Sequence, residues 1–186
     1  MREIHVYDLI VVGGGPGGYT AALYAARAGL DTLVLEKLSA GGQMALTEEI
    51  DNYPGFEDGI DGFTLAEKMQ QQAERFGAGS EYAQVERLDL TASPKVLETS
   101  EGTFCAKTVV LATGAQRQRP RIPGLDDFDG AGVSYCAVCD GFFCRGKEVA
   151  VLGAGTYALH EAGVLLPLAK RVTLLTNGEP APGELP

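Results

Sequence analysis

Short apolar runs that stop at glycine alternate with helical patterns in the first part of the chain. Residues 7–12 are apolar and rich in β-branched side chains, and they predict a buried parallel strand. The alanine-rich residues 19–28 predict a helix that closes at Gly29, and residues 32–35 predict a second strand that ends at Glu36. Strand, glycine turn, helix, strand and acid follow one another in the order of a dinucleotide-binding α/β fold.

The glycine turn between the first strand and the helix has the spacing of a dinucleotide site. Gly13, Gly15 and Gly18 satisfy Gly-x-Gly-x-x-Gly. In this pattern the first glycine allows a tight turn, the second lets the backbone approach a pyrophosphate, and the third lets the helix pack closely on the sheet. Glu36 would accept hydrogen bonds from ribose hydroxyls. A glycine turn without a ligand is the less favoured alternative, because the whole context is present.

Loops, a packing helix and further strands are predicted beyond Glu36. Gln43 and Asn52 lie in turn-rich stretches and offer amide donors for a ring system, and a role as plain turn residues is equally open. Apolar residues at helical spacing predict a packing helix from about Phe63. Short antiparallel strands are expected at residues 85–90, 96–97 and 104, and a buried strand at residues 108–111. A turn of small residues then lets the chain leave the sheet beside a ligand.

A proline-containing polar stretch, residues 116–124, predicts a linker between two domains. We therefore expect a first domain over residues 1–115 and a second region over residues 116–186. In the second region, Gly153 and Gly155 form another dinucleotide-type turn. The elements expected around that turn are a strand at 148–152, a helix at 158–169 kinked by Pro167 and a strand at 171–175.

Cys136 and Cys139 are separated by two residues, and Asp140 follows the second cysteine. If one turn of helix begins at the first cysteine, the pair can close a small disulfide ring, and the helix start lowers the thiol pKa. Asp140, if shielded from water, could donate a proton near neutral pH. Alternatively, it could cap a helix. A zinc site is a less favoured alternative, because no second pair at fixed spacing accompanies the first. Its further ligands would be Cys144, Cys105 or His160.

Composition restricts the partners and the compartment. The chain has 186 residues, of which 45% are hydrophobic and 22% charged, as in an ordinary globular protein of one or two domains. Lys plus Arg is 15 and Asp plus Glu is 25, and the net charge of −10 argues against a nucleic-acid partner. No apolar stretch predicts a membrane span or a secretory signal. With four cysteines and no export signal, we expect a cytoplasmic protein. Cys105 is expected to be a small buried or half-buried hydrophobe.

Five motifs between about Tyr7 and Gly153 resemble those of the low-molecular-weight flavoprotein thioredoxin reductases, a branch of the pyridine nucleotide-disulfide oxidoreductases. In chain order they are Gly-Gly-Gly-Pro-Gly-Gly, Gly-Gly-Gln, Asn-Tyr-Pro-Gly, Ala-Thr-Gly and Ser-Tyr-Cys-Ala-Val-Cys-Asp-Gly. The resemblance implies an α/β fold: a Rossmann-like FAD-binding domain with a parallel sheet and three-layer ββα character, then the start of a smaller Rossmann-like nucleotide domain. The family returns to complete its flavin domain after the point where this chain stops, so we expect a truncated product.

The resemblance also implies roles for individual residues. Cys139 is expected to face the flavin, Cys136 to attack the disulfide of a partner, and Asp140 to protonate the departing thiolate. Noncovalent FAD would contact Gly13, Gly15, Pro16 and Gly17 at its pyrophosphate, Glu36 at its ribose, Gln43 and Asn52 near the flavin, and Gly42, Val85, Ala112, Thr113 and Gly114 elsewhere in the site.

The same resemblance suggests the electron donor and the partners. A pyridine nucleotide would contact Gly153 and Gly155, but Thr176-Asn177-Gly178 stand where the family places a basic triplet for the 2′-phosphate, so NADPH, NADH and ferredoxin all stay open as donors. The expected acceptor is thioredoxin or a similar disulfide protein, and the full-length protein is expected to be a homodimer. The alternatives are the flavoprotein subunit of an alkyl hydroperoxide reductase and a noncatalytic nucleotide-binding fragment.

Overall fold

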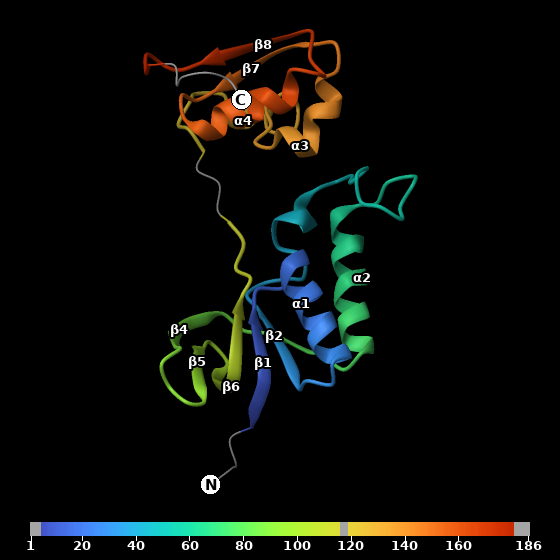
Figure 1. The fold of residues 1–186 in the computed structure, drawn as a ribbon, viewed down its shortest axis with the longest axis vertical. Helices are drawn as coiled ribbons and strands as arrows, with labels where there is room; N and C mark the ends of the chain where they lie inside the picture. Colours follow the sequence, from blue (N-terminus) through green and yellow to red (C-terminus); the bar gives the residue numbers. More distant parts are fainter. Residues whose placement is uncertain (1–4, 116–118, 181–186) are drawn as a thin grey trace. The chain divides into compact units, whose positions relative to one another are not determined.

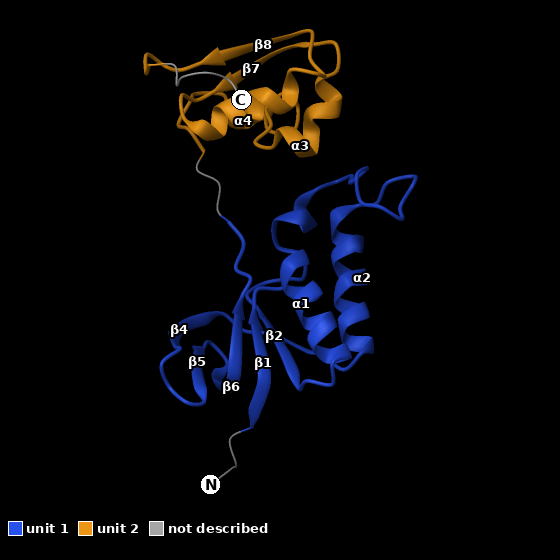
Figure 2. Ribbon diagram, in the orientation of Figure 1, with its two compact units in different colours: residues 1–116 blue, residues 117–186 orange. Residues whose placement is uncertain are grey.

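The computed structural model describes residues 5–115 and 119–180. The chain divides into two compact units, residues 1–116 and residues 117–186, which have different colours in Figure 2. Part of the predicted linker, residues 116–118, lies outside the described residues.

A six-stranded mixed sheet forms the centre of the first unit (Figure 1). In spatial order its strands are β3 (Gly79–Tyr82), β2 (Thr32–Glu36), β1 (Val6–Val12), β6 (Gly102–Leu111), β5 (Lys95–Thr99) and β4 (Val85–Asp89). The four strands from β3 to β6 run parallel, whereas β5 and β4 are antiparallel to their neighbours. The predicted parallel strand at the start of the chain is therefore the central one.

Two helices, α1 (Pro16–Arg27) and α2 (Gly62–Arg75), lie side by side on one face of the sheet (Figure 1). Small residues at helical spacing, such as Ala22 and Ala26 of α1, are buried and let the helix approach the strands closely. The Asp61 side chain caps α2 by accepting a hydrogen bond from the Thr64 N–H at 2.8 Å. Together with Leu9 and Val11 of β1, these helices enclose the first hydrophobic core.

The opposite face of the sheet is also buried. Alternate residues of β1, Ile10 and Val12, point into a second hydrophobic cluster that includes Leu97 of β5 and Ala106 of β6. The antiparallel end of the sheet therefore covers the face opposite the helices. Burial on both faces explains why residues 9–12 of β1 and residues 32–35 of β2 are buried without alternation. Helices, parallel sheet and antiparallel strands give the expected three-layer α/β architecture.

Three details of the first unit differ from the sequence-based expectations. The strands expected at Phe104 and at residues 108–111 are one continuous strand, because β6 pairs with β5 over its first half and with β1 over its second half. The prediction that residues 108–111 are buried is wrong: β5 begins beside Ala106 and does not extend along residues 108–111, and Val110 and Leu111 are exposed. The short strand β3 was not predicted, because Gly-Ser-Glu-Tyr has no apolar pattern. Cys105 is buried, as predicted.

A parallel pair of strands, β7 (Glu148–Leu152) and β8 (Arg171–Leu175), lies in the second unit with α4 (Thr156–Leu165) between them in sequence. Both strands match their predicted bounds. The helix, however, ends before Pro167, so the predicted kinked helix to residue 169 is wrong: proline has no N–H with which to continue the helical hydrogen bonds. Within residues 5–115 and 119–180, no helix is both long enough and apolar enough to cross a bilayer.

The close contact between α1 and the glycine turn generates a stability prediction. A Cβ at Gly18 would lie 1.8 Å from the Gly13 carbonyl oxygen, whereas a Cβ at Gly17 would have no atom within 4 Å. We expect Gly18→Ala to lower the free energy of unfolding by about 3 kcal/mol, because backbone must move to admit the methyl group. Gly17→Ala, the matched control, should leave it unchanged or raise it by up to about 1 kcal/mol. Urea unfolding followed by circular dichroism would compare them, and equal midpoints for both variants would contradict the packing.

Candidate functional site

The glycine turn lies where β1, β6 and α1 meet. Gly13 has φ of +107°, and a Cβ on it would lie 2.3 Å from the Ala112 carbonyl oxygen. The residue after β6 therefore packs directly against the turn, and Ala112 N–H donates to the Val12 carbonyl at 2.8 Å. Only glycine combines this conformation with this close approach. The structure thus places Gly13, Ala112 and Thr113 together, as expected for one site.

The beginning of α1 is open to an anionic group. The helix starts at Pro16 after Gly15, and within the described part of the chain no side chain caps it. The first N–H groups of a helix have no partner inside the helix, and they carry partial positive charge. The absence of any atom near a Cβ at Gly17 leaves space in front of them. This arrangement fits the pyrophosphate of a dinucleotide such as FAD.

Glu36 closes the turn from the side of β2. One carboxylate oxygen accepts a hydrogen bond from the Gly14 N–H at 2.6 Å, and the other accepts from the Lys37 N–H at 2.7 Å. Sequence reasoning assigned this side chain to a ribose, and that role stays a prediction. The structure adds a second role, because the carboxylate holds the backbone of the turn.

Tyr19, in the first turn of α1, is a neighbour of the glycine turn that sequence reasoning missed. It is 1% exposed, and its ring lies 3.1 Å from where a Cβ on Gly14 would be. Burial raises the pKa of the Tyr19 phenol. The side chain is therefore neutral at physiological pH and supports the turn by packing rather than by charge.

Two loops join the glycine turn from other parts of the sequence. The Gly41 N–H donates to the Gly14 carbonyl at 2.7 Å, which brings the short helix η1 (Gly42–Leu46) to the turn. The Gln43 side-chain amide donates to the Ala115 carbonyl, just after the loop that follows β6. Gly42, Gln43 and the segment Ala112–Gly114 are therefore gathered at the end of the parallel strands where ligands bind in such folds.

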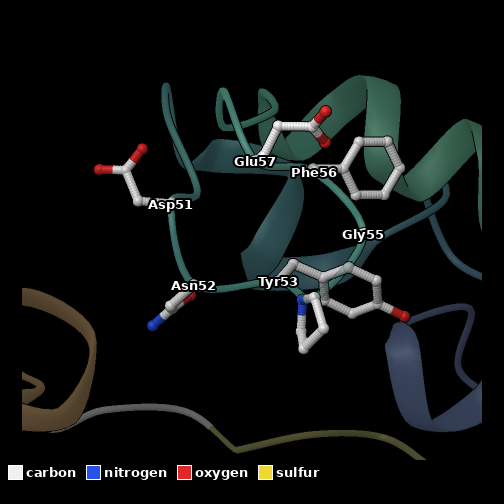
Figure 3. Close-up of a pocket in the computed structure, with 7 residues that line it drawn as sticks. Asp51, Asn52, Tyr53, Gly55, Phe56 and Glu57 are labelled. Carbon is white, nitrogen blue, oxygen red and sulfur yellow. The ribbon is translucent and has the colours of Figure 1, made fainter.

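Asn52 and Val85 are not part of these contacts. Asn52 belongs to a loop that curls around an open hollow lined by residues 51–57. In Figure 3 the Asp51 and Asn52 side chains point to one side of this loop and the rings of Tyr53 and Phe56 to the other. Val85 begins β4 and is partly buried in the second hydrophobic cluster. The hydrogen bonds described above do not extend to either residue, and their flavin contacts stay predictions.

A disulfide between Cys136 and Cys139 forms the chemical centre of the second unit, with the two Cα atoms 5.3 Å apart. As predicted, one turn of helix begins here: α3 (Ala137–Asp140) has Cys136 as its N-cap. The Cys136 sulfur accepts a hydrogen bond from the Cys139 N–H at 3.2 Å. Because both sulfurs are bonded to each other, neither is available as the thiolate ligand that the zinc alternative requires. Residues 5–115 and 119–180 contain no group of three His, Cys, Asp or Glu side chains placed to hold a metal.

Asp140 is held by a serine that sequence reasoning did not assign. The Ser134 hydroxyl donates to the Asp140 carboxylate and accepts a hydrogen bond from the Cys136 N–H at 3.1 Å. Asp140 ends α3 and occupies the N-cap position of the following short helix η3 (Gly141–Cys144), as in the alternative interpretation, but its side chain makes no capping hydrogen bond to η3. A serine two residues before a cysteine is a local signal for such a turn, and it was available in the sequence.

Glu161 of α4 also contacts the disulfide helix. Its carboxylate accepts a hydrogen bond from the Ala137 N–H at 2.6 Å. The two residues are 24 positions apart, so no sequence pattern indicated this contact. It is one of the contacts that join α3 to α4.

The second glycine turn has the same open form as the first. Gly153 has φ of +142°, and a Cβ on it would lie 2.9 Å from the Cβ of Ala158. Gly155 precedes α4 and has no atom within 4 Å of an added Cβ, and no side chain in the described ranges caps the helix. The Tyr157 side chain at the helix start is 67% exposed. The turn can therefore accept an anionic group in the same way.

Known proteins are similar to this chain over a range that includes both glycine turns and the disulfide. A family model described as "Pyridine nucleotide-disulphide oxidoreductase" matches residues 7–181. The thioredoxin reductase of Bacillus subtilis (strain 168) is 43% identical over 175 residues, which are 94% of this chain and 55% of that protein. The bifunctional thioredoxin reductase/thioredoxin of Mycobacterium leprae (strain TN) is 47% identical over 171 residues, or 91% of this chain and 37% of that protein.

Solved structures give the same result. The crystal structure of thioredoxin reductase from Streptococcus pyogenes MGAS5005 matches with a TM-score of 0.86 and 40% identity, over 98% of this chain and 59% of that chain. The chain spans about half the length of the curated relatives it matches, such as those of B. subtilis and Treponema pallidum. Because the family model covers nearly the whole sequence, the chain belongs to the pyridine nucleotide-disulphide oxidoreductase family.

Proposed function

We propose that the protein is a thioredoxin reductase, in which electrons from a reduced donor pass through FAD and the Cys136–Cys139 disulfide to the disulfide of thioredoxin. The observation that carries the proposal is a disulfide at the start of a helix in a chain that also has an open dinucleotide turn. The names of the relatives support it, and the M. leprae relative carries thioredoxin in its own name. We place the activity in the cytoplasm, where donors keep thiols reduced.

FAD would lie on the first glycine turn. Its pyrophosphate would face Gly13, Gly15, Pro16 and Gly17, and its ribose would face Glu36. Gly42, Gln43, Ala112, Thr113 and Gly114 would border the rest of the cofactor, with Asn52 and Val85 as the less supported contacts. When bound and reduced by the donor, the flavin would supply the two electrons that convert the disulfide to a dithiol. The open helix start and the backbone gathered around Gly13 support this placement.

The dithiol then reduces the partner by two exchanges. The Cys136 thiolate attacks one sulfur of the partner disulfide, and a mixed disulfide forms while the other partner sulfur departs with the electron pair and takes a proton from Asp140. The Cys139 thiolate next attacks the Cys136 sulfur, which restores the internal disulfide and releases the second partner thiolate. The hydrogen bond from the Cys139 N–H to the Cys136 sulfur supports Cys136 as the attacking thiolate.

Exposed apolar side chains beside the disulfide support a protein as the acceptor. Val138, Phe142 and Phe143 are 66%, 68% and 59% exposed. Large apolar side chains clustered next to a reactive group are typical of a surface that a protein partner covers. We propose that thioredoxin contacts these three residues when its disulfide meets Cys136.

Replacing either cysteine tests the function and separates the two roles. Both Cys136→Ser and Cys139→Ser should abolish thioredoxin reduction, while flavin reduction by the donor continues. Cys139→Ser should accumulate a mixed disulfide between Cys136 and thioredoxin, detectable on a nonreducing gel, because no second thiol is present to release it. Cys144→Ser is the control and should behave as the unmodified protein. Normal turnover in the Cys136→Ser variant would refute the proposed function.

Replacing the Asp140 carboxyl group by an amide tests its proposed role as the general acid. Asp140→Asn should slow thioredoxin reduction about a hundredfold or more, the range for loss of a general acid, whereas Ser134→Ala should have a smaller effect because the acid remains. The rate of reoxidation of the prereduced protein by thioredoxin disulfide measures the step directly. An Asp140→Asn rate equal to that of the unmodified protein would exclude the acid role.

The second glycine turn and the residues after β8 determine which electron donor the protein can bind. A pyridine nucleotide would bind the second turn at Gly153 and Gly155. The chain after β8 has Thr176, Asn177 and Gly178, none of which carries a positive charge to pair with a 2′-phosphate, so we expect NADH or reduced ferredoxin rather than NADPH. Anaerobic titration of the FAD-loaded protein with each donor, followed by flavin absorbance, measures the preference. Bleaching by NADPH at lower concentration than by NADH or ferredoxin would contradict this expectation.

A further inference from the structure

We infer that Glu161 is a positioning residue for the redox pair, and that its carboxylate, reaching from α4 to the start of α3, restrains the reactivity of the Cys136 thiol. The inference rests on the proposed function, in which this thiol attacks the partner. Its evidence is the geometry of the disulfide helix itself, and all the groups involved belong to the second unit.

The N–H groups at the start of α3 are divided between a carboxylate and a sulfur. The Ala137 N–H donates to Glu161 at 2.6 Å, and the Cys139 N–H donates to the Cys136 sulfur at 3.2 Å. The Asp140 N–H is taken by the Cys136 carbonyl at 3.1 Å. Two acceptors from different elements therefore share one helix start, and one of them is the reactive sulfur.

The electrostatic consequence follows from the sign of the charges. An unpaired helix start favours a thiolate, and this lowers the pKa of a cysteine at the N-cap. A carboxylate that accepts a hydrogen bond from the adjacent N–H partly neutralises the positive potential of the helix start. It also places a negative charge near the negatively charged thiolate. Glu161 should thus raise the pKa of the reduced Cys136 thiol relative to a neutral side chain. The protein would then hold less thiolate at neutral pH than the helix start alone would produce.

Packing fixes the carboxylate in this place. Glu161 is partly buried in α4, whose buried residues include Ala162 and Leu165. Gly141, directly after α3, is buried against Leu168 and Leu165, whose nearest methyl groups lie 3.2 and 3.4 Å, respectively, from where its Cβ would be. The residue after α3 therefore packs against the end of α4 and the residue Leu168 beyond it, in addition to the hydrogen bond from the Ala137 N–H to Glu161.

Two other charged groups near α3 have other partners. Asp140 is bound by Ser134, and Arg119, which lies 5.2 Å over the Tyr135 ring, pairs with Asp129 at 2.6 Å. The remaining charged or titratable side chains on the neighbouring elements are Cys144, Arg145, Tyr157 and His160. Of the described residues, Glu161 is the one whose side chain reaches the α3 backbone from α4.

The test measures the thiol without turnover. The protein is reduced with dithiothreitol, and the alkylation rate of Cys136 by iodoacetamide is followed against pH by mass spectrometry of its peptide. Glu161→Gln keeps an oxygen acceptor for the Ala137 N–H but removes the charge, so the midpoint pH for Cys136 should fall by roughly one unit. Glu161→Asp keeps the charge and should retain most of the original midpoint if it still reaches the N–H.

Glu148→Gln is the matched control. Glu148 is an exposed carboxylate of the same unit and pairs with Lys170 at 3.5 Å, so its removal changes the net charge equally and should leave the midpoint unchanged. A Glu161→Gln midpoint equal to that of the unmodified protein, or an equal shift in Glu148→Gln, would overturn the inference. Because alkylation needs no FAD, donor or thioredoxin, this outcome is separate from a failure of the proposed reductase function, which would appear as absent turnover.

Discussion

Close backbone contact at the glycine turn is the constraint on which the first unit depends. A Cβ on Gly18 would meet the Gly13 carbonyl at 1.8 Å, and a Cβ on Gly13 would meet the Ala112 carbonyl at 2.3 Å. Helix α1, the turn and the chain leaving β6 are therefore stacked without side chains between them. This stacking points the uncapped start of α1 into open space at the end of the parallel strands, where an anionic cofactor group can approach.

In the second unit, the single helical turn α3 needs other contacts to stabilise it, because one turn of helix is not stable alone. The turn α3 is closed covalently by the Cys136–Cys139 disulfide and is held by three side chains: the Cys136 sulfur, the Ser134 hydroxyl and the Glu161 carboxylate. The groups that stabilise the helix are the same groups that surround the reactive sulfur. Reduction of the disulfide removes one of these constraints and leaves the hydrogen-bonding groups to position the thiols.

Much of this arrangement could be predicted from local sequence. The glycine spacing, the acid after β2 and the Cys-x-x-Cys pair each specify geometry within a few residues, and the structure has a tight turn at Gly13 and a helix start at Cys136. Contacts between segments that are distant in the sequence have no such local pattern, so they could not be predicted. The hydrogen bond from Ala137 to Glu161 and the pairing of β3 with β2 depend on the path of the chain between distant segments. The exposure of Leu111 depends on where β5 begins. The end of α4 before Pro167 shows that proline stopped a helix that was expected to bend.

The proposed reductase activity requires that a flavin and the Cys136–Cys139 disulfide form one electron-transfer system. Anaerobic stepwise reduction of the FAD-loaded protein with dithionite, counting electrons consumed per flavin, tests it most directly. The account predicts that the unmodified protein consumes two electrons for the flavin and two more for the disulfide, and that a variant with serine at both cysteines consumes only the two for the flavin. Equal consumption by the two proteins, or failure of the protein to bind FAD, would contradict the account.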